Sequence, residues 1–377
     1  MNKKKVLIIF GTRPEAIKMA PLIKEFQNKK KIFETKVCIT AQHREMLDQV
    51  LEFFQISVNF DLDIMKQNQN LYTLTSSIIL DMKTVLENFQ PDYIFVHGDT
   101  TTSMAAGLAG FYYKTKICHI EAGLRSQNKF SPYPEEMNRL ITSKLADFHF
   151  APTDTARQNL IDEKIDSDKI IITGNTVIDA LFLCLKKIKD KPTQEIENLE
   201  KKFNTSNKII LVTAHRRESY GTGFKNICKA LIQISDLHKD CTIVYPVHLN
   251  PNVKEIVFKN LSGINNIHLI EPLSYSSFVW LMNKCKIILT DSGGIQEEAP
   301  ALGKPVIVLR NVTERKEAID CGTAILTGTD SSKIVEVVDN LLEDKKLYDK
   351  MSTTKNPYGD GCSSKKIVNF LIDLENA

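Results

Sequence analysis

Short runs of Val and Ile alternate along this chain with longer segments of helical periodicity, and this alternation limits the possible folds more than any other feature. A first set of strand-length runs covers residues 6–10, 36–40, 93–97, 116–120, 148–151 and 169–173. A second set covers residues 208–213, 241–247, 266–270, 286–290 and 305–310. Apolar strands joined by helices are typical of βαβ units, in which helices cover both faces of a parallel sheet. The sequence therefore predicts an α/β fold.

The two sets of strands indicate two domains. A chain of 377 residues exceeds the size at which one core usually keeps growing, and a polar stretch at residues 186–207 separates the two sets. We predict a first domain of residues 1–170 and a second of residues 171–357. Ligands of open α/β sheets bind beyond the carboxyl ends of the strands, so we expect the turns at those ends to face one cleft.

Composition argues against several classes of function. The 49 Lys and Arg nearly balance the 46 Asp and Glu, and the basic residues are dispersed, so nucleic-acid binding gains little support. No apolar run is long enough for a membrane span or a signal peptide, and we expect no membrane partner. The eight cysteines include no Cys-x-x-Cys pair, which favours reduced thiols in a cytoplasmic protein. No spacing of His, Asp or Glu indicates a metal site.

Two cations follow the first predicted strand. Gly11 would leave room for a ligand, Arg13 offers a planar fork to an anion, and Lys18 lies deeper in the predicted helix. A lysine at such a position is normally solvated surface. As a pair at the end of a strand, Arg13 and Lys18 favour an anion-binding site.

Small residues in the second domain follow a strand and open a predicted helix. The backbone N–H groups of Ser292, Gly293 and Gly294 could bind a phosphate there, and Glu298 could reach ribose hydroxyls. The alternative is an ordinary turn capped by Ser292, with Glu298 favouring the helix dipole. The chain has neither a Gly-x-Gly-x-x-Gly fingerprint nor a P-loop, so no motif indicates a nicotinamide or ATP-type phosphate site.

Carboxylates gather at predicted strand ends of the first domain and at the start of a helix. Asp99 and Glu121 follow strands, and Glu135 begins the helix. Several carboxylates close to phosphate-binding cations suit general acid and base chemistry on a sugar. Each also has a simpler interpretation: Asp99 as a turn residue, Glu121 as the partner of Arg125, and Glu135 as a helix N-terminal charge.

A basic turn in the second domain places His215 directly after a strand, which makes it the leading phosphate donor there. Its neighbours Arg216 and Arg217 could instead pair with nearby acids.

These motifs together resemble those of the non-hydrolysing UDP-N-acetylglucosamine 2-epimerases of bacteria. The similar motifs are Gly-Thr-Arg-Pro-Glu-Ala-Ile-Lys-Met-Ala-Pro from Gly11, Thr-Ala-Gln-His-Arg-Glu-Met-Leu-Asp from Thr40, His-Gly-Asp-Thr-Thr-Thr from His97, Glu-Ala-Gly-Leu-Arg from Glu121, Pro-Glu-Glu-Met-Asn-Arg from Pro134, His-Arg-Arg-Glu from His215, Thr-Asp-Ser-Gly-Gly-Ile-Gln-Glu-Glu-Ala-Pro from Thr290 and Asn-Pro-Tyr-Gly-Asp-Gly from Asn356. The resemblance implies a GT-B fold, with two Rossmann-like domains facing a central cleft. It also implies a C-terminal helix, about residues 358–377, that packs back on the first domain, and a homodimer.

The resemblance further implies roles for individual residues and no cofactor. The UDP portion would be held by Arg13, His215, Ser292, Gly293, Gly294, Glu298 and Arg315, with Phe278 near the uracil. The sugar and its leaving group would be surrounded by Lys18, Asp99, Glu121 and Glu135. His215 would also serve the chemistry, and the resemblance leaves open which acid takes which proton.

Some members of the family bind UDP-N-acetylglucosamine a second time as an activator. The corresponding segments here hold Gln42, Glu45 and Asn68, and His248 is a further candidate. Members in which activation is best established have Gln and Arg at the positions of Glu45 and Asn68, so we expect activation here to be weak or altered.

The implied activity is the interconversion of UDP-N-acetylglucosamine and UDP-N-acetylmannosamine for surface polysaccharide precursors. The alternatives are a hydrolysing relative that releases N-acetylmannosamine and UDP, a GT-B glycosyltransferase, and a non-catalytic sensor. Hydrolysing relatives usually lack the continuation from Pro14 to Lys18 that this chain has. Because the C2 hydrogen of the sugar is not next to a carbonyl, we expect UDP to depart first and to leave 2-acetamidoglucal.

Overall fold

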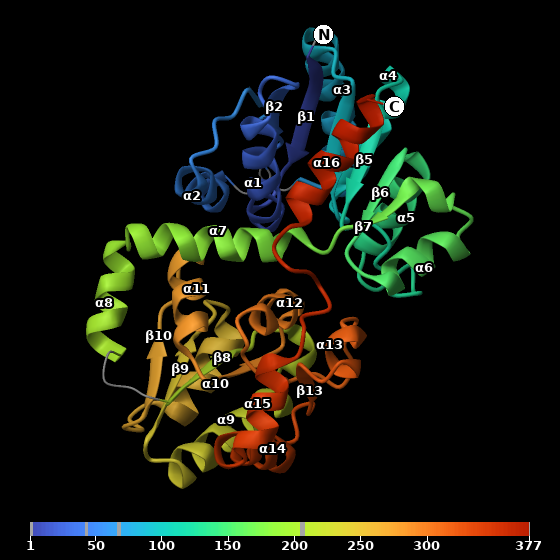
Figure 1. Ribbon diagram of the computed structural model, residues 1–377. Helices are drawn as coiled ribbons and strands as arrows, with labels where there is room; N and C mark the ends of the chain where they lie inside the picture. The colour runs from blue at the N-terminus through green and yellow to red at the C-terminus, as the bar shows by residue number, and fades with distance from the viewer. Residues whose placement is uncertain (1–2, 42–43, 66–68, 204–207, 377) are drawn as a thin grey trace. The chain divides into compact units, whose positions relative to one another are not determined.

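The computed structural model describes residues 3–41, 44–65, 69–203 and 208–376, and the chain divides into two compact units (Figure 1). The first unit is Met1–Ala180 with Tyr358–Ala377, and the second is Leu181–Pro357. The division falls later in the chain than the expected one at 170/171. The reason is that the strand Ile170–Ile172 still pairs with the first sheet.

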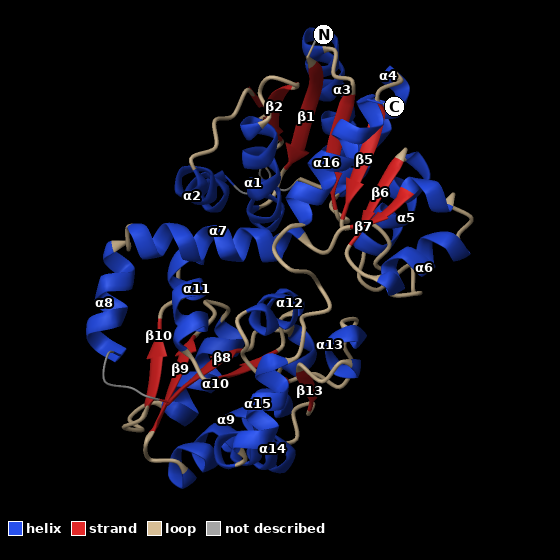
Figure 2. Ribbon diagram, in the orientation of Figure 1, coloured by secondary structure: helices blue, strands red, loops and turns tan. Residues whose placement is uncertain are grey.

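The described part of the first unit contains a seven-stranded parallel sheet of order β3-β2-β1-β4-β5-β6-β7. Figure 2 draws its strands in red. Its strands are β1 (Lys4–Phe10), β2 (Phe33–Ile39), β3 (Phe60–Asp61), β4 (Tyr93–His97), β5 (Lys116–Ile120), β6 (Phe148–Ala151) and β7 (Ile170–Ile172). The strand order reverses between β1 and β4, which is the point at which open α/β sheets usually bind ligands.

Helices pack on this sheet through apolar faces. They are α1 (Arg13–Asn28), α2 (Arg44–Phe54), α3 (Leu71–Phe89), α4 (Thr101–Tyr113), α5 (Glu135–Leu145), α6 (Asp154–Asp162) and the C-terminal α16 (Ser363–Asn376). Ile94 and Val96 of β4 pack in one core with residues of α3 and α4. Phe370 of α16 makes edge contacts with Phe148 and Phe150, whose ring centroids lie 5.3 and 5.7 Å away, so the C-terminal helix completes the first unit.

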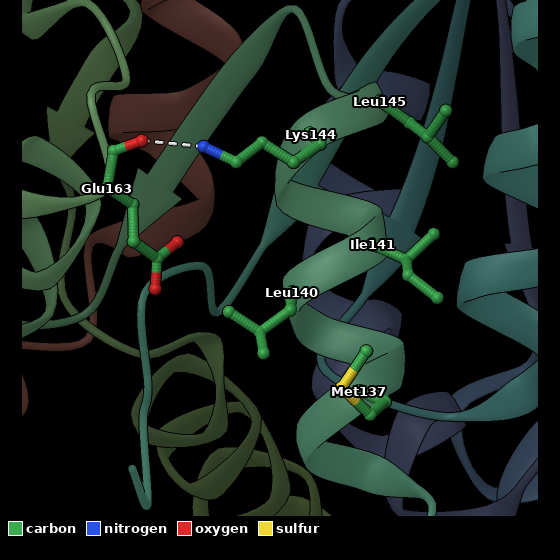
Figure 3. A pocket seen from close by; sticks show the side chains of 6 residues that line it. All are labelled: Met137, Leu140, Ile141, Lys144, Leu145 and Glu163. Carbon is green, nitrogen blue, oxygen red and sulfur yellow. Dashed lines mark hydrogen bonds between the residues drawn. The ribbon is translucent and has the colours of Figure 1, made fainter. Parts of the chain in front are cut away.

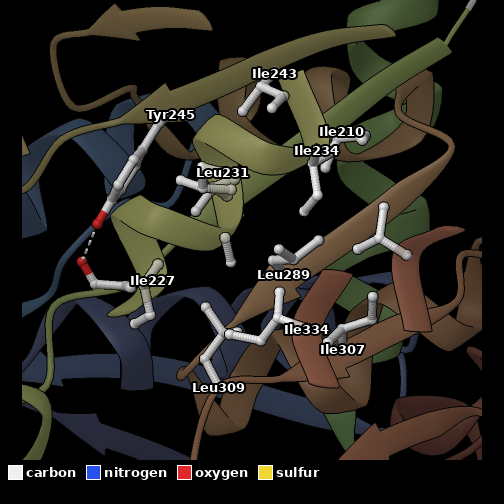
Figure 4. Packing of buried hydrophobic residues seen from close by; sticks show 14 of the residues in the cluster. Ile210, Ile227, Leu231, Ile234, Ile243, Tyr245, Leu289, Ile307, Leu309 and Ile334 are labelled. Atoms are coloured by element: carbon white, nitrogen blue, oxygen red, sulfur yellow. Dashed lines mark hydrogen bonds between the residues drawn. The ribbon is translucent and has the colours of Figure 1, made fainter. Parts of the chain in front are cut away.

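The second unit contains a six-stranded parallel sheet of order β10-β9-β8-β11-β12-β13. Its strands are β8 (Lys208–Thr213), β9 (Cys241–Pro246), β10 (Ile267–Ile270), β11 (Ile287–Thr290), β12 (Val306–Val308) and β13 (Ala324–Leu326). Its helices are α8 (Gln194–Phe203), α9 (Thr222–Leu237), α10 (Pro251–Leu261), α11 (Tyr275–Lys284), α12 (Gly293–Ala301), α13 (Lys316–Asp320), α14 (Ser331–Glu343) and α15 (Lys345–Thr353), and α7 (Thr176–Asp190) enters it from the first unit. Leu231, Ile234 and Leu289 pack in its core (Figure 4), where the Tyr245 hydroxyl donates to the Ala214 carbonyl at 2.9 Å.

The predicted α/β class with two Rossmann-like domains is confirmed. The sequence did not predict β3, Phe60–Asp61, or β13, Ala324–Leu326, since neither lies in a run of Val or Ile like the Ile-rich run that gave β7. No helix among the described residues is long and apolar enough to cross a membrane.

Candidate active site

Three of the predicted turns lie at one edge of the first sheet because their strands are neighbours. β4 pairs with β1 on one side and with β5 on the other, all in parallel. The turns after Phe10, His97 and Ile120 therefore emerge together at the carboxyl edge of the sheet. This edge carries Arg13, Lys18, Asp99 and Glu121.

The first of these turns is fixed by Glu15, which is 2% exposed. Its Oε2 accepts from the Gly11 and Thr12 N–H groups at 3.0 and 2.8 Å, which completes a capping box at the start of α1. Its Oε1 accepts from the hydroxyls of Thr100 and Ser103 at 2.7 and 3.2 Å. Burial raises the pKa of Glu15, and these hydrogen bonds act in the opposite direction. One carboxylate thus joins the turn after β1 to the turn after β4.

Gly11 is required by the packing of its own neighbours. A Cβ atom at this position would lie 2.1 Å from Thr40 Oγ1 and 2.4 Å from Thr102 Oγ1, and these two hydroxyls hydrogen-bond each other at 2.9 Å. The missing side chain makes room for packing between strand ends, and ligand approach is not needed to explain it.

Glu121 is constrained in both its backbone and its side chain. Its backbone adopts φ 60°, a left-handed conformation that costs a residue with a Cβ atom roughly 1–3 kcal/mol and that clusters at functional sites. Lys18 Nζ pairs with its Oε2, and Asn175 Nδ2 donates to the same oxygen at 2.6 Å. The simpler interpretation of Glu121 as the partner of Arg125 is wrong, because Arg125 forms a bidentate pair with Glu163 at 2.6 and 2.8 Å.

His97 lies beside this pair, with its Nε2 3.9 Å from Glu121 Oε2. Burial lowers the pKa of His97 to about 4, while Glu121 raises it and Lys18 lowers it by smaller amounts. The imidazole is therefore neutral near pH 7. It fills space next to the carboxylate without adding charge.

Asp99 is held from α5, since its carboxylate pairs with Arg139 and its carbonyl accepts from Asn138 Nδ2 at 2.9 Å. It is therefore more than a turn residue. Arg139 also lies 3.3 Å from Glu136, a buried carboxylate that accepts from backbone N–H groups of the preceding loop. Glu135, the predicted third acid, is the first residue of the same helix. The structure thus places Lys18 with Glu121, and Asp99 with α5.

The second unit builds its turn around Asp291, which is fully buried after β11. Asp291 Oδ2 accepts from the backbone N–H groups of His215 and Arg216 at 2.7 and 2.8 Å. Its Oδ1 lies 3.4 Å from His215 Nδ1. Arg216 donates from Nε to the Asp291 carbonyl at 2.9 Å, and its Nη2 lies 3.9 Å from Glu314 Oε1, so it pairs with a nearby acid as the alternative interpretation expected. Asp291 therefore fixes the backbone at His215 and Arg216 and lies beside the His215 ring.

His248, predicted as a possible activator contact, lies against this turn. Its ring stacks on that of His215 with centroids 5.3 Å apart and planes 15° apart. Burial lowers the pKa of His248, and the neighbouring His215 lowers it further. A change at His248 would therefore act directly on the histidine predicted to serve the chemistry.

The small residues after β11 open α12 as predicted. Ser292 occupies the N-cap position, yet among the described residues its hydroxyl makes no capping bond, so the capped-turn alternative does not explain this serine. Arg315 lies over the turn, since a Cβ atom at Gly293 would meet its Cζ at 3.1 Å. Glu297 holds Arg315 at 2.9 Å. Glu298, 9% exposed, lies one turn along the same helix.

The remaining predicted residues have fewer described contacts. Phe278 lies part-buried in α11, while Gln42 and Asn68 and the side chain of Glu45 lie outside the described residues. Sequence reasoning missed Glu15, Arg139, Asn175 and Asp291 as positioning groups. Asn175 and Asp291 follow strands at the same sheet edges as the predicted residues, and that position was the available signal.

The strand-end turns of the two Rossmann-like units carry cations, fixed carboxylates and an exposed histidine. This combination is typical of an enzyme that acts on an anionic ligand such as a nucleotide. The comparisons with known proteins are more specific. The family model described as UDP-N-acetylglucosamine 2-epimerase matches residues 24–372. The chain belongs to the UDP-N-acetylglucosamine 2-epimerase family.

Individual relatives resemble the chain over almost its whole length. A Yersinia pestis protein named UDP-N-acetylglucosamine 2-epimerase is 54% identical over 370 residues, which are 97% of this chain and 98% of the relative. The crystal structure of the Neisseria meningitidis enzyme bound to UDP-GlcNAc has 53% identity and a TM-score of 0.89, covering 98% of this chain and 100% of that one. The Methanocaldococcus jannaschii enzyme in complex with UDP-GlcNAc and UDP has 34% identity and a TM-score of 0.79, covering 98% and 99%.

Proposed function

We propose that this chain interconverts UDP-N-acetylglucosamine and UDP-N-acetylmannosamine without releasing free sugar. The observation that carries the proposal is Glu121, whose backbone is left-handed and whose carboxylate is held by Lys18 and Asn175 at the carboxyl edge of the sheet. An oriented carboxylate beside a cation suits proton transfer next to a departing phosphate. Support for the substrate comes from the Neisseria meningitidis relative, whose structure contains UDP-GlcNAc.

The UDP portion is assigned to Arg13, His215, Ser292, Gly293, Gly294, Glu298 and Arg315, with Phe278 near the uracil. The uncapped start of α12 and the Arg315 guanidinium above Gly293 support this assignment. Replacing Arg13 or His215 by Ala removes a donor to the pyrophosphate. The binding free energy for UDP, measured by calorimetry, should weaken by roughly 1.5 to 3 kcal/mol in each variant.

The reaction balances as an elimination followed by an addition. The C1–O bond breaks to release UDP, one of Asp99, Glu121 and Glu135 removes the C2 proton that this departure acidifies, and the C–H electron pair forms the C1–C2 double bond. Arg13, His215 and the Ser292 turn stabilise the charge on the departing pyrophosphate. A second acid then protonates C2 on the opposite face, and a UDP oxygen adds back at C1 of the 2-acetamidoglucal.

Turnover in heavy water tests this mechanism. Proton NMR of UDP-N-acetylglucosamine with the protein should show UDP-N-acetylmannosamine with deuterium at C2, and slow leakage of 2-acetamidoglucal and UDP. Free N-acetylmannosamine as the main product would indicate a hydrolysing enzyme. Product that keeps its original C2 hydrogen would rule out the elimination.

We propose that the working form is a homodimer. A groove of about 430 Å³ in the first unit, lined by Met137, Leu140, Ile141, Lys144, Leu145 and Glu163, presents apolar side chains of α5 (Figure 3). On the neighbouring α4, Phe111 and Tyr112 are 57% and 66% exposed. An apolar surface of this kind suits burial against a second copy. Light scattering should give twice the chain mass of 42.7 kDa.

Three further parts of the proposal concern regulation and setting. Activation by UDP-N-acetylglucosamine is weak or altered, because Glu45 and Asn68 replace Gln and Arg. Strongly sigmoidal rate curves, with UDP-N-acetylmannosamine inert until UDP-N-acetylglucosamine is added, would contradict this.

The product serves surface polysaccharide precursors in the cytoplasm, and the eight free cysteines, six of them buried, are consistent with a reducing compartment.

A further inference from the structure

Asn175 contacts the central carboxylate of the site and is itself held from two sides. It directly precedes α7, and its Oδ1 accepts from the Val177 N–H at 3.2 Å, as an N-cap residue does. Because Oδ1 is engaged at the helix, the amide nitrogen must face the other way. Nδ2 donates there to Glu121 Oε2 at 2.6 Å. The helix start therefore fixes which end of the amide meets the carboxylate.

The backbone of Asn175 is fixed by the C-terminal segment of the first unit. Its N–H donates to the Tyr358 carbonyl at 2.7 Å. A Cβ atom at Gly174, φ +86°, would lie 2.9 Å from Ser363 Oγ and 3.0 Å from Gly359 Cα, so the two segments approach as closely as backbone allows. Asn175 is only 2% exposed. An amide held this firmly supplies a hydrogen bond with little freedom to rearrange.

We propose that Asn175 is a positioning residue that holds the Glu121 carboxylate in the orientation required for proton transfer at C2 of the sugar. This inference rests on the proposed function. Three groups within the described contacts face Glu121: Lys18 from α1, His97 from β4 and Asn175. Lys18 supplies charge on a flexible chain, and the neutral His97 stays 3.9 Å away. Among these three, Asn175 provides the rigid, directional contact.

Two replacements separate the contact with Glu121 from the cap of α7. Asn175→Ser keeps a capping oxygen but is too short to reach Glu121. Asn175→Asp keeps the size and the cap but places a second carboxylate against Oε2, where two like charges disfavour joint ionisation. The charge control is Asn340→Asp, at an exposed residue of α14 in the second unit.

The parent protein is first tested in heavy water, because absence of C2 deuterium there defeats the proposed function itself. With a functional parent, Asn175→Ser should lower kcat roughly 10- to 100-fold, the range for losing one hydrogen bond to a charged group, with KM changed far less. Asn175→Asp should also move the acid limb of the pH profile of kcat to higher pH. Both variants should bind UDP with the parent's affinity by calorimetry, and Asn340→Asp should match the parent throughout.

Parental kcat in Asn175→Ser would show that the cap alone explains this residue and would overturn the inference. A lower kcat in Asn175→Asp with an unshifted pH profile would do the same, because a purely structural defect reduces the rate at every pH. UDP binding lost together with activity would also point to a general folding defect and contradict a positioning role.

Discussion

The two units secure their strand-end turns by different means. In the first, side chains from separate elements converge on carboxylates: Glu15 joins two turns, and Glu121 receives Lys18 and Asn175. In the second, the buried Asp291 receives mainly backbone N–H groups and leaves the His215 side chain 44% exposed. The first arrangement restricts the carboxylates themselves, among them Glu121, which is proposed to transfer a proton. The second fixes the backbone and leaves the histidine ring accessible to a ligand.

This contrast predicts that substitution of a site carboxylate in the first unit lowers kcat and leaves UDP binding unchanged. Glu121→Gln keeps the shape of the side chain but removes its charge and its basicity. We expect kcat to fall roughly 100- to 10,000-fold, the range for losing a general acid or base. Calorimetry should find UDP affinity within about twofold of the parent's, a difference well under 1 kcal/mol.

The control for this variant is Glu87→Gln, which changes an exposed partner of Lys83 in the same unit and lies outside the proposed site. It should retain most of the parental kcat. If Glu121→Gln instead lost UDP affinity as severely as rate, the separation of roles between the two units would be wrong.

Acid should distinguish the units by stability, because the first unit buries three histidines. Burial lowers the pKa of His97 to about 4, of His119 to about 3 and of His149 to about 4, from an ordinary 6.5. Between pH 6.5 and about 4 the unfolded chain binds protons that the folded chain does not, so stability falls as pH falls. Each histidine contributes on the order of 3 kcal/mol across that window. Glu15 and Asp179, whose pKa values burial raises, oppose this loss.

The single tryptophan, Trp280 in α11, allows a direct measurement. In an acid titration, circular dichroism should report loss of structure at a higher pH than Trp280 fluorescence, which senses the second unit. His149→Gln, which cannot titrate, should move the first transition to lower pH. Coincident transitions in the parent would show that the two units unfold together.

A substitution in the second unit should have a smaller effect, and the effect should be on UDP binding. Asp291→Asn replaces a carboxylate oxygen near His215 by an amide, which weakens the hold on the turn. The binding free energy for UDP should weaken by about 1.5 to 3 kcal/mol, the range for a hydrogen bond to a charged group. Calorimetry measures it directly, and Asp240→Asn, at an exposed ion pair with Lys208, is the control. Unchanged affinity would mean that Asp291 has no part in presenting His215.

The residues that the sequence identified and those that it missed differ in how far their partners lie along the chain. Strand-end position and residue type were enough for Glu121 and His215, because both are local properties. The Asn175 contact joins residues 54 positions apart, and the Asp291 contact joins residues 76 apart. Such pairs depend on strand order, which a single sequence does not specify. The left-handed conformation of Glu121 also lacks a local signal, since glycine is the residue normally expected there.

The smallest expected effect tests how the first unit holds its turns together. Glu15→Gln keeps one acceptor oxygen and replaces the other by an NH₂ group. That group stands where Glu15 accepts either the N–H groups of Gly11 and Thr12 or the hydroxyls of Thr100 and Ser103. Loss of those bonds destabilises the fold, while removal of a buried charge returns part of the desolvation cost. The free energy of unfolding in urea should therefore fall by only about 1 to 2 kcal/mol. Glu25→Gln, a part-buried residue of the same helix, should change it by less than about 0.5 kcal/mol. Equal effects of the two substitutions would mean that the packing of α1 alone secures the turn. The contrast between side-chain anchoring in the first unit and backbone anchoring in the second would then depend on Glu121 and Asp291 alone.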